Sequence, residues 1–336
     1  MVEIILKLLT KFTVVSAFVL SQGLTLQAAN AQQANDFPNK SLNYIVPFPP
    51  GGPSDVAGRV LADALGKKLN QTIVVENKSG ASGSIGINQL IRSKPDGYTV
   101  ASLAAPSLTA PFILSQPPYD LEKDVKSVGI AYITPLVIVV NAKKYPDITD
   151  MKSLAQAAKN SKEGINYTSA AIGSTANLAM ELIKKDLGIN MTHIPFRGSA
   201  PAVTAVLAGD VPIMYSDLVA VLAQIKAGNL RPIAVNTEQR LEELPEVPTL
   251  KEQDIQASKA VSWSGLLVPK DTADGTVKIL SDALESVVND PAIQTRLKAV
   301  GAYPFYTDSK TMQETIARDS AIWSEVIEEN NLRQQN

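Results

Sequence analysis

A strand–loop–helix pattern that occurs twice in succession near the start of the chain constrains the fold more than any other feature. Pro and Gly mark the first loop, and apolar residues then recur at helical spacing. The expected elements are a strand at 42–46, a loop at 47–55, a helix to Leu69, a strand at 72–76, a loop at 77–84, a helix at 85–91 and a strand at 98–103. This alternation predicts a parallel sheet with right-handed crossovers, and Ser54 or Asp55 is the expected N-cap of the first helix.

A second α/β set follows an apolar strand at 135–141. Its expected elements are a helix at 151–160, a strand at 165–168, a helix at 175–187, a strand at 191–195, a helix at 200–208, a strand at 211–215, a helix at 217–227 and a strand at 230–235. A strand at 262–268 and helices at 273–289, 291–299 and 309–330 complete the chain. This order predicts an α/β fold of two lobes joined by two crossings, with the C-terminal helices packed on lobe one. We expect lobe one to comprise 41–138 plus 264–336, and lobe two 139–263.

Composition narrows the possible partners of this chain. The 336 residues are 45% hydrophobic, the formal net charge is -2, and no basic stretch is dense enough to follow a phosphate backbone. Nucleic acid is therefore excluded as a partner, and an anionic ligand has to be held by local dipoles. The absence of cysteine excludes disulfides, thiol catalysis and a lipid anchor on a processed N-terminal Cys.

The N-terminus has the features of a signal peptide. Lys7 and Lys11 accompany an apolar run to Leu20, and Ala29-Asn30-Ala31 has the form that a signal peptidase cleaves. The alternative is a membrane anchor, but polar residues interrupt the apolar run before it reaches the roughly 20 residues needed to span a bilayer. We therefore expect a signal peptide at 1–31 and a mature protein that is exported to the periplasm.

Two loops are candidates for ligand binding, because ligands of open α/β sheets bind beyond the carboxyl ends of the strands. In the loop 47–55, Gly51-Gly52 allows close backbone approach, and the helix that follows can offer N–H groups to an anion. The loop 169–175 is small, rich in hydroxyls and occupies the matching place in lobe two. Together they predict a clamp for a carboxylate. Asp217 is a third candidate, and its alternative role is to cap the helix that follows it. Phe48 is a fourth, which either covers the ligand or packs against the turn.

Catalysis is the first rival function. His193 is the single histidine of the chain and lies in an expected strand, where a structural role is favoured. Tyr167, Glu181 and Asp217 are other conceivable acid–base groups, but no spacing forces any two of them together. The sequence shows no nucleophile elbow, metal cluster or cofactor loop. We expect neither an enzyme nor a bound metal or cofactor.

Several segments carry a resemblance to a known family. They are 46–55 (VPFPPGGPSD), 75–86 (VENKSGASGSIG), 95–99 (PDGYT), 166–167 (NY), 173–175 (GST), 193–198 (HIPFRG), 244–249 (LPEVPT), 263–266 (WSGL) and Trp323. In this order they resemble the extracytoplasmic solute receptors of the tripartite tricarboxylate transporters, the Bug family, over nearly the whole mature chain. The resemblance implies a two-lobed, type II-like periplasmic binding fold that closes over its ligand.

The same resemblance implies a ligand site and partners. The matching site positions are Phe48, Gly52, Ser54, Ala105, Ser107, Ser169, Gly173, Ser174 and Asp217. Asn177 departs from the pattern, because many members carry histidine there, and 103–107 is less polar than expected. The implied ligand is a dicarboxylate, tricarboxylate, acidic amino acid, aromatic acid or nicotinate-like compound. The implied protein is a monomer that delivers it to integral membrane transporter subunits. A sensor that binds a membrane receptor kinase remains the alternative.

Overall fold

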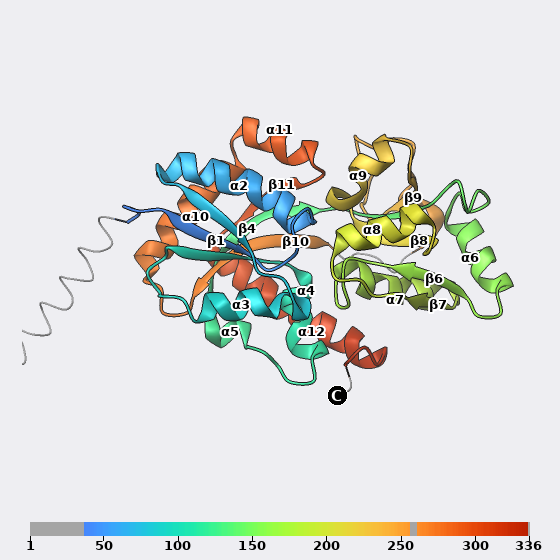
Figure 1. The fold of residues 1–336 in the computed structure, drawn as a ribbon, viewed down its shortest axis with the longest axis horizontal. Coiled ribbons are helices and arrows are strands. Elements are labelled where there is room, and N and C mark those ends of the chain that lie inside the picture. Colours follow the sequence, from blue (N-terminus) through green and yellow to red (C-terminus); the bar gives the residue numbers. More distant parts are fainter. Residues whose placement is uncertain (1–36, 256–260, 335–336) are drawn as a thin grey trace, which may run out of the picture. The chain divides into compact units, whose positions relative to one another are not determined.

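The computed structural model describes residues 37–255 and 261–334, so the predicted signal peptide at 1–31 lies outside the described residues. Lys40–Asn336 form one compact unit. This unit contains a six-stranded sheet and a five-stranded sheet, each with helices packed against it (Figure 1). The expected mixed α/β fold is therefore confirmed.

The six-stranded sheet has the order β11-β4-β10-β3-β1-β2. Its strands are β1 (Leu42–Val46), β2 (Ile73–Asn77), β3 (Thr99–Leu103), β4 (Val125–Thr134), β10 (Ser262–Pro269) and β11 (Tyr303–Thr307). β1 pairs in parallel with β2 and β3, as the strand–helix alternation predicts, whereas β10 is antiparallel to both β3 and β4. Helical crossovers cover both faces of such a sheet, which is why the central β1 and β3 are almost entirely buried.

The five-stranded sheet has the order β7-β6-β8-β5-β9. Its strands are β5 (Leu136–Val140), β6 (Ile165–Thr168), β7 (Met191–His193), β8 (Ile213–Asp217) and β9 (Arg231–Val235). β6 pairs in parallel with β7 and β8, and β5 runs antiparallel to β8 and β9. The continuous apolar run of β5 is fully buried, as a strand covered on both faces requires.

Helices cover both faces of the sheets. Their bounds are α2 (Pro53–Leu69), α3 (Ser84–Ile91), α4 (Ala105–Ile113), α5 (Leu121–Asp124), α6 (Met151–Asn160), α7 (Thr175–Leu187), α8 (Ser199–Ala208), α9 (Leu218–Lys226), α10 (Asp274–Val288), α11 (Pro291–Ala299) and α12 (Ser309–Glu329), with 3-10 turns η1 (Ala81–Gly83) and η2 (Lys251–Gln253). On the six-stranded sheet, α2 contacts α10 and α11 on one face, and α4 contacts α3 and α12 on the other (Figure 1).

The chain passes between the sheets twice. It leaves the six-stranded sheet at Pro135, between β4 and β5, and it returns between β9 and β10. The C-terminal α10 and α12 both contact β4, so the predicted packing of these helices on the first lobe is confirmed.

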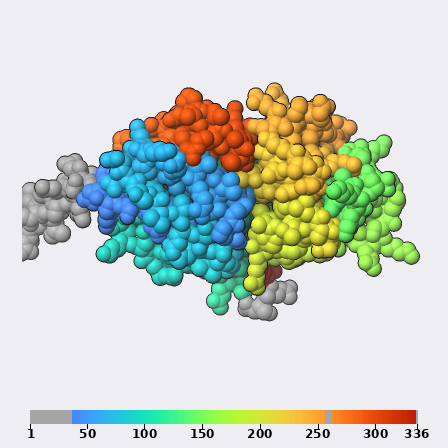
Figure 2. Space-filling model, turned by 45° about the horizontal axis from the view of Figure 1, so that its top comes forward, coloured from blue at the N-terminus to red at the C-terminus, as the bar shows by residue number. Residues whose placement is uncertain are grey.

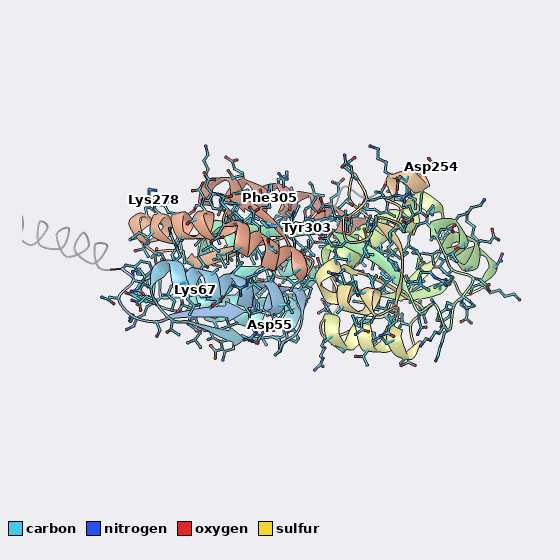
Figure 3. All side chains as sticks on the ribbon, turned by 90° about the horizontal axis from the view of Figure 1, so that it is seen from above. Asp55, Lys67, Asp254, Lys278, Tyr303 and Phe305 are labelled. Atoms are coloured by element: carbon cyan, nitrogen blue, oxygen red, sulfur yellow. The ribbon has the colours of Figure 1, made fainter. Side chains whose placement is uncertain are left out.

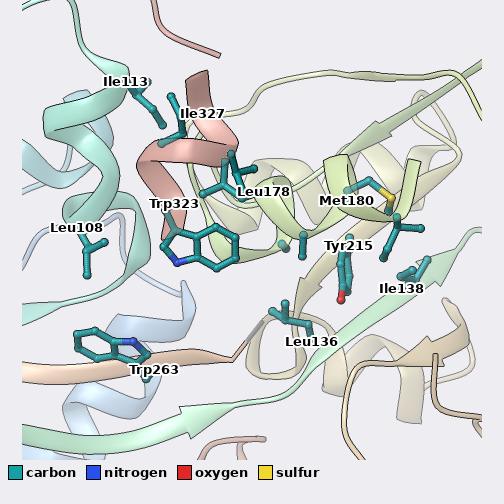
Figure 4. Close-up of a cluster of buried hydrophobic side chains, with 14 of the residues drawn as sticks. Leu108, Ile113, Leu136, Ile138, Leu178, Met180, Tyr215, Trp263, Trp323 and Ile327 are labelled. Carbon is teal, nitrogen blue, oxygen red and sulfur yellow. The ribbon is translucent and has the colours of Figure 1, made fainter. Parts of the chain in front are cut away.

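Side chains from elements on both sheets share one hydrophobic cluster. Trp323 and Ile327 of α12 lie beside Leu178 of α7 and Ile113 of α4 (Figure 4). All four side chains are buried. The helix α12 therefore packs against helices that belong to both sheets.

The elements that were not predicted from the sequence are β4, α4, α5, β11 and the 3-10 turns η1 and η2. Pro106 and Pro111 lie within α4, and proline inside a short segment masks its helical periodicity. The predicted N-cap of α2 was wrong as well. Gly52 occupies the N-cap and Pro53 the first helical position, where its fixed φ favours the helix.

Candidate ligand-binding site

A small cavity lies where the loops of the two sheets meet. The loop before α2, the start of α4, and parts of β4 and β10 line it from the six-stranded side. Parts of the loop before α7, the start of α8 and Asp217 line it from the five-stranded side. Its volume is about 60 Å³. This is room for a small molecule or a few waters. Figure 2 shows the blue surface around α2 meeting the yellow surface around α8, and α2 also contacts α9.

Besides α9, whose N-cap is the acidic Asp217, four helices begin at this cavity. The N-cap residues of α2, α7 and α8 are Gly52, Ser174 and Gly198, and all three line it. The N-cap of α4 is Ala104, which also lines it. The first N–H groups of a helix have no partner within that helix, and each N-terminus carries a partial positive charge. The cavity therefore collects four positive dipole ends.

A buried carboxylate holds the first loop in place. Asp55 accepts hydrogen bonds from the Gly51 N–H at 2.9 Å, the Arg59 Nε at 3.0 Å and the Asn77 Nδ2 at 2.9 Å. Burial raises the pKa of Asp55, but the hydrogen bonds from these partners outweigh it and hold the pKa below its usual range. Asn77 Nδ2 also donates to the Phe48 carbonyl at 3.0 Å. Asp55, which Figure 3 labels, is therefore a positioning residue of the loop.

The second loop uses its own hydroxyl groups. The Ser174 hydroxyl donates to Ser169 Oγ at 3.1 Å and accepts from the Asn177 N–H at 3.2 Å, while Ser169 Oγ donates to the Ala171 carbonyl at 3.1 Å. Asn177 Oδ1 accepts the Gly173 N–H at 3.0 Å. The two serine hydroxyl hydrogens and the Asn177 N–H are used inside the loop, so the donors left for a ligand are the first N–H groups of α7, those of Thr175 and Ala176.

His193 supports this loop from β7. Its Nε2 lies 2.9 Å from Ser169 Oγ, and its ring is tilted against Tyr167 with the centroids 5.0 Å apart. Burial lowers the pKa of His193 to about 4, so the imidazole is neutral at pH 7. His193 is not among the residues that line the cavity.

Asp217 and Tyr132 are the titratable residues among those that line the cavity. Asp217 is the last residue of β8 and the N-cap of α9, but its side chain makes no capping hydrogen bond, which removes the alternative role considered for it. Burial raises the pKa of Asp217 to about 6, against a hydrogen bond with Ser262. Burial also raises the pKa of Tyr132 to about 12, with hydrogen bonds to Ser264 and Ser54 opposing the shift.

The structure brings together most of the residues expected from the sequence. Those that line the cavity are Phe48, Gly52, Ser54, Ala105, Ser174 and Asp217. Ser107, Ser169 and Gly173 do not line it, although Ser169 and Gly173 belong to the loop that does. Sequence reasoning missed Tyr132, because β4 was not expected. It also missed the start of α8, which the Gly198-Ser199 pair ahead of an apolar helix could have indicated.

Charge is sparse at the cavity. Among the described residues that line it there is no Lys, Arg or His, and Asp217 is the single carboxylate. No group of three or more His, Cys, Asp or Glu side chains within 37–255 and 261–334 is arranged to hold a metal ion. In the same ranges, no helix is long and apolar enough to cross a membrane.

Comparison with known proteins gives consistent matches. Residues 57–332 match the family described as tripartite tricarboxylate transporter family receptor. The chain is 32% identical to protein BugT of Bordetella pertussis over 318 residues, covering 94% of this chain and 96% of that protein. It is similar to the structure of the periplasmic binding protein BugD, with 30% identity, a TM-score of 0.81 and coverage of 89% and 100%. An R. palustris protein solved with adipate gives 28% identity, a TM-score of 0.83 and coverage of 87% and 98%.

Proposed function

Because the chain belongs to the tripartite tricarboxylate transporter receptor family, and is thus a periplasmic solute-binding receptor, we propose that its cavity captures a small carboxylate for delivery to a membrane transporter. One observation carries this proposal. Four helix N-termini line one small cavity that has no cationic side chain among its lining residues.

Helix N-termini suit an anion that must later be released. Each contributes about 0.3–1 kcal/mol to a nearby negative charge, and several N–H groups together can replace much of the water around a carboxylate. A buried Arg–carboxylate pair would bind with fixed bidentate geometry. Amide donors from two lobes instead hold the ligand only while the lobes are together.

The adipate bound to the R. palustris relative supports a carboxylate for this chain as well. The candidates are a dicarboxylate, a tricarboxylate, an acidic amino acid or an aromatic acid. The proposed lobe one comprises about 41–138 plus 264–336 and lobe two about 139–263, with each boundary within a few residues of the crossings beside Pro135 and before β10, and with the ligand between the lobes. The protein acts as a monomer, is exported by the signal peptide at 1–31, and meets integral membrane transporter subunits.

A thermal-shift screen tests the carboxylate proposal. A ligand present at 100 times its Kd adds about 2.7 kcal/mol to the free energy of unfolding, so a true ligand raises Tm clearly. Each acid is paired with its neutral amide, for example adipate with adipamide. We expect shifts from acids and none from the matched amides. Equal shifts from acid and amide, or no shift from any acid of the panel, would contradict the proposal.

A further inference from the structure

One polar atom in the cavity wall has no partner. The Oδ1 atom of Asp217 is buried and makes no hydrogen bond with any of the described residues. A buried carboxylate oxygen without a donor is costly, so natural proteins rarely leave one unless a ligand or ion completes it.

The surroundings of Asp217 explain why the protein itself does not supply the donor. From β10, Ser262 hydrogen-bonds to the carboxylate. From β4, the Tyr132 hydroxyl is engaged by Ser264 and Ser54. On its own sheet, Asp217 pairs with Leu136 of β5, which offers no side-chain donor. Because no Lys, Arg or His lines the cavity, the N-terminal dipole of α9, whose N-cap is Asp217, is the positive charge next to this carboxylate.

On the premise of the proposed function, we propose that Asp217 selects ligands that carry a hydrogen-bond donor, a hydroxyl or an ammonium, in addition to the captured carboxylate. The ligand's hydroxyl or ammonium donates a hydrogen bond to Oδ1 of Asp217, while the helix N-termini hold the ligand's carboxylate. The ligand class is thus a small hydroxy acid or amino acid. A dicarboxylate brings two acceptors and no donor, and it is accommodated only when one proton is taken up to make a neutral carboxyl group.

The titration of Asp217 agrees with this geometry. Its pKa of about 6 leaves it ionised at pH 8 and largely protonated at pH 5. Tyr132, with a pKa of about 12, stays neutral over this range and does not add a second charge. The protonated Asp217 is itself a donor, so affinity for a dicarboxylate rises as the pH falls through about 6.

Isothermal titration calorimetry on the mature protein tests this with ligands matched in length. One set is adipate, 6-hydroxyhexanoate and 6-aminohexanoate, and the other is succinate, 4-hydroxybutanoate and 4-aminobutanoate. At pH 8 we expect a donor-bearing acid to bind at least about tenfold more tightly than the dicarboxylate of its set. Repeating the titrations in two buffers of different ionisation enthalpy measures proton uptake. We expect about one proton for the dicarboxylates and none for the donor-bearing acids.

The variant Asp217→Asn tests the role of the carboxylate. Its amide oxygen can still accept a hydrogen bond from Ser262, and its NH₂ group adds a donor that the carboxylate lacks. We expect it to lose the proton uptake and the preference against dicarboxylates. Asp210→Asn, an exposed change after α8, should alter neither. If Asp217→Asn does not fold, the proton uptake of the unsubstituted protein decides the question.

The outcomes separate this inference from the proposed function. Dicarboxylates that bind as tightly as their partners at pH 8 without proton uptake overturn the role of Asp217 and leave carboxylate capture intact. Failure of every acid in both sets to bind counts against both proposals.

Discussion

Asn177 shows how one side chain determines what a binding loop can offer. Its Oδ1 accepts the Gly173 N–H, and its Nδ2 donates to the Tyr167 hydroxyl at 3.0 Å. Tyr167 in turn donates to Glu181 at 2.8 Å, and Lys184 pairs with Glu181 at 2.6 Å. The amide therefore joins the loop to a buried polar chain and withdraws the Gly173 N–H from the ligand. Asn177 supports the loop, whereas Oδ1 of Asp217 has no such partner among the described residues.

The first prediction concerns the stability of the ligand-free protein. The folded pKa of Asp217 lies above its unfolded value, so the carboxylate destabilises the fold at pH above about 6, and this cost vanishes below pH 4. Asp217→Asn should raise the free energy of unfolding at pH 8 by about 2 kcal/mol, with the difference shrinking toward pH 4. Urea unfolding at both pH values measures this, with Asp210→Asn as control. A variant less stable than the unsubstituted protein at pH 8 would show that Oδ1 of this carboxylate has a donor after all.

The second prediction concerns His193, whose pKa is lowered in the folded protein, whereas that of Asp217 is raised. Its folded pKa of about 4 lies below the unfolded value, so its stabilising contribution is complete above pH 6.5 and is lost as the pH falls toward 4. His193→Gln should therefore flatten the decline in unfolding free energy between pH 7 and pH 5 by roughly 1–2 kcal/mol. Ligand affinity at pH 7 should stay within a few-fold, because the ring supports Ser169 and lies outside the cavity lining. A large loss of affinity would move the site toward β7 and reopen an enzymatic role.

At the scale of elements, sequence periodicity identified strands and helices whose patterns are uninterrupted. The helices α6 and α7 and the strand β1 have the predicted bounds, because their caps and apolar spacing act locally. The helix α4 was missed because two prolines break its pattern, and the long β4 because Lys126, Ser127 and Gly129 interrupt its apolar run. Most residues of the two expected loops line the cavity. The contributions of β4 and β10 depend on an antiparallel pairing between segments far apart in sequence, which no local pattern reveals.

The start of α4 allows a direct test of amide binding. Ala105 is the first residue of this helix, and a proline there removes one N–H while its fixed φ remains compatible with the helix. We expect Ala105→Pro to fold normally and to weaken binding of the best carboxylate by about tenfold, as loss of one hydrogen bond to a charged group should. Ala105→Ser keeps the N–H and should bind like the unsubstituted protein. Equal affinity of the two variants in calorimetry would exclude this amide from the site.

At the scale of the whole compact unit, direct contacts link the elements of the two sheets. The Thr109 hydroxyl of α4 donates to the Gly173 carbonyl at 2.9 Å, and Tyr303 of β11 (Figure 3) hydrogen-bonds to Glu243. Gly198 lies so close to Pro49 that an added Cβ would stand 3.0 Å from the proline Cγ. These contacts hold the four helix N-termini around one space, so we expect ligand binding to depend on contact between the proposed lobes.

Gly173 is the point where this coupling can be broken selectively. A Cβ at this residue would lie 2.1 Å from Ile113 Cδ1 and 2.5 Å from Thr109 Oγ1, so alanine forces these side chains to shift and should weaken the contact between the loop before α7 and α4. Gly188 is a matched control, because it also has a positive φ, 59° against 75°, but nothing within 4 Å of an added Cβ. Both alanine variants should lower Tm through similar backbone strain, since alanine disfavours positive φ.

Only Gly173→Ala should also lose affinity, by about tenfold or more, because the helix N-termini on the two sides can no longer surround the ligand together. Ile113→Val removes the Cδ1 atom, and in the Gly173→Ala background it should restore part of the binding. Calorimetry of the three variants, with small-angle scattering before and after ligand addition, measures both effects. If Gly173→Ala binds as tightly as Gly188→Ala, the cavity does not require this contact, and one lobe alone accounts for capture.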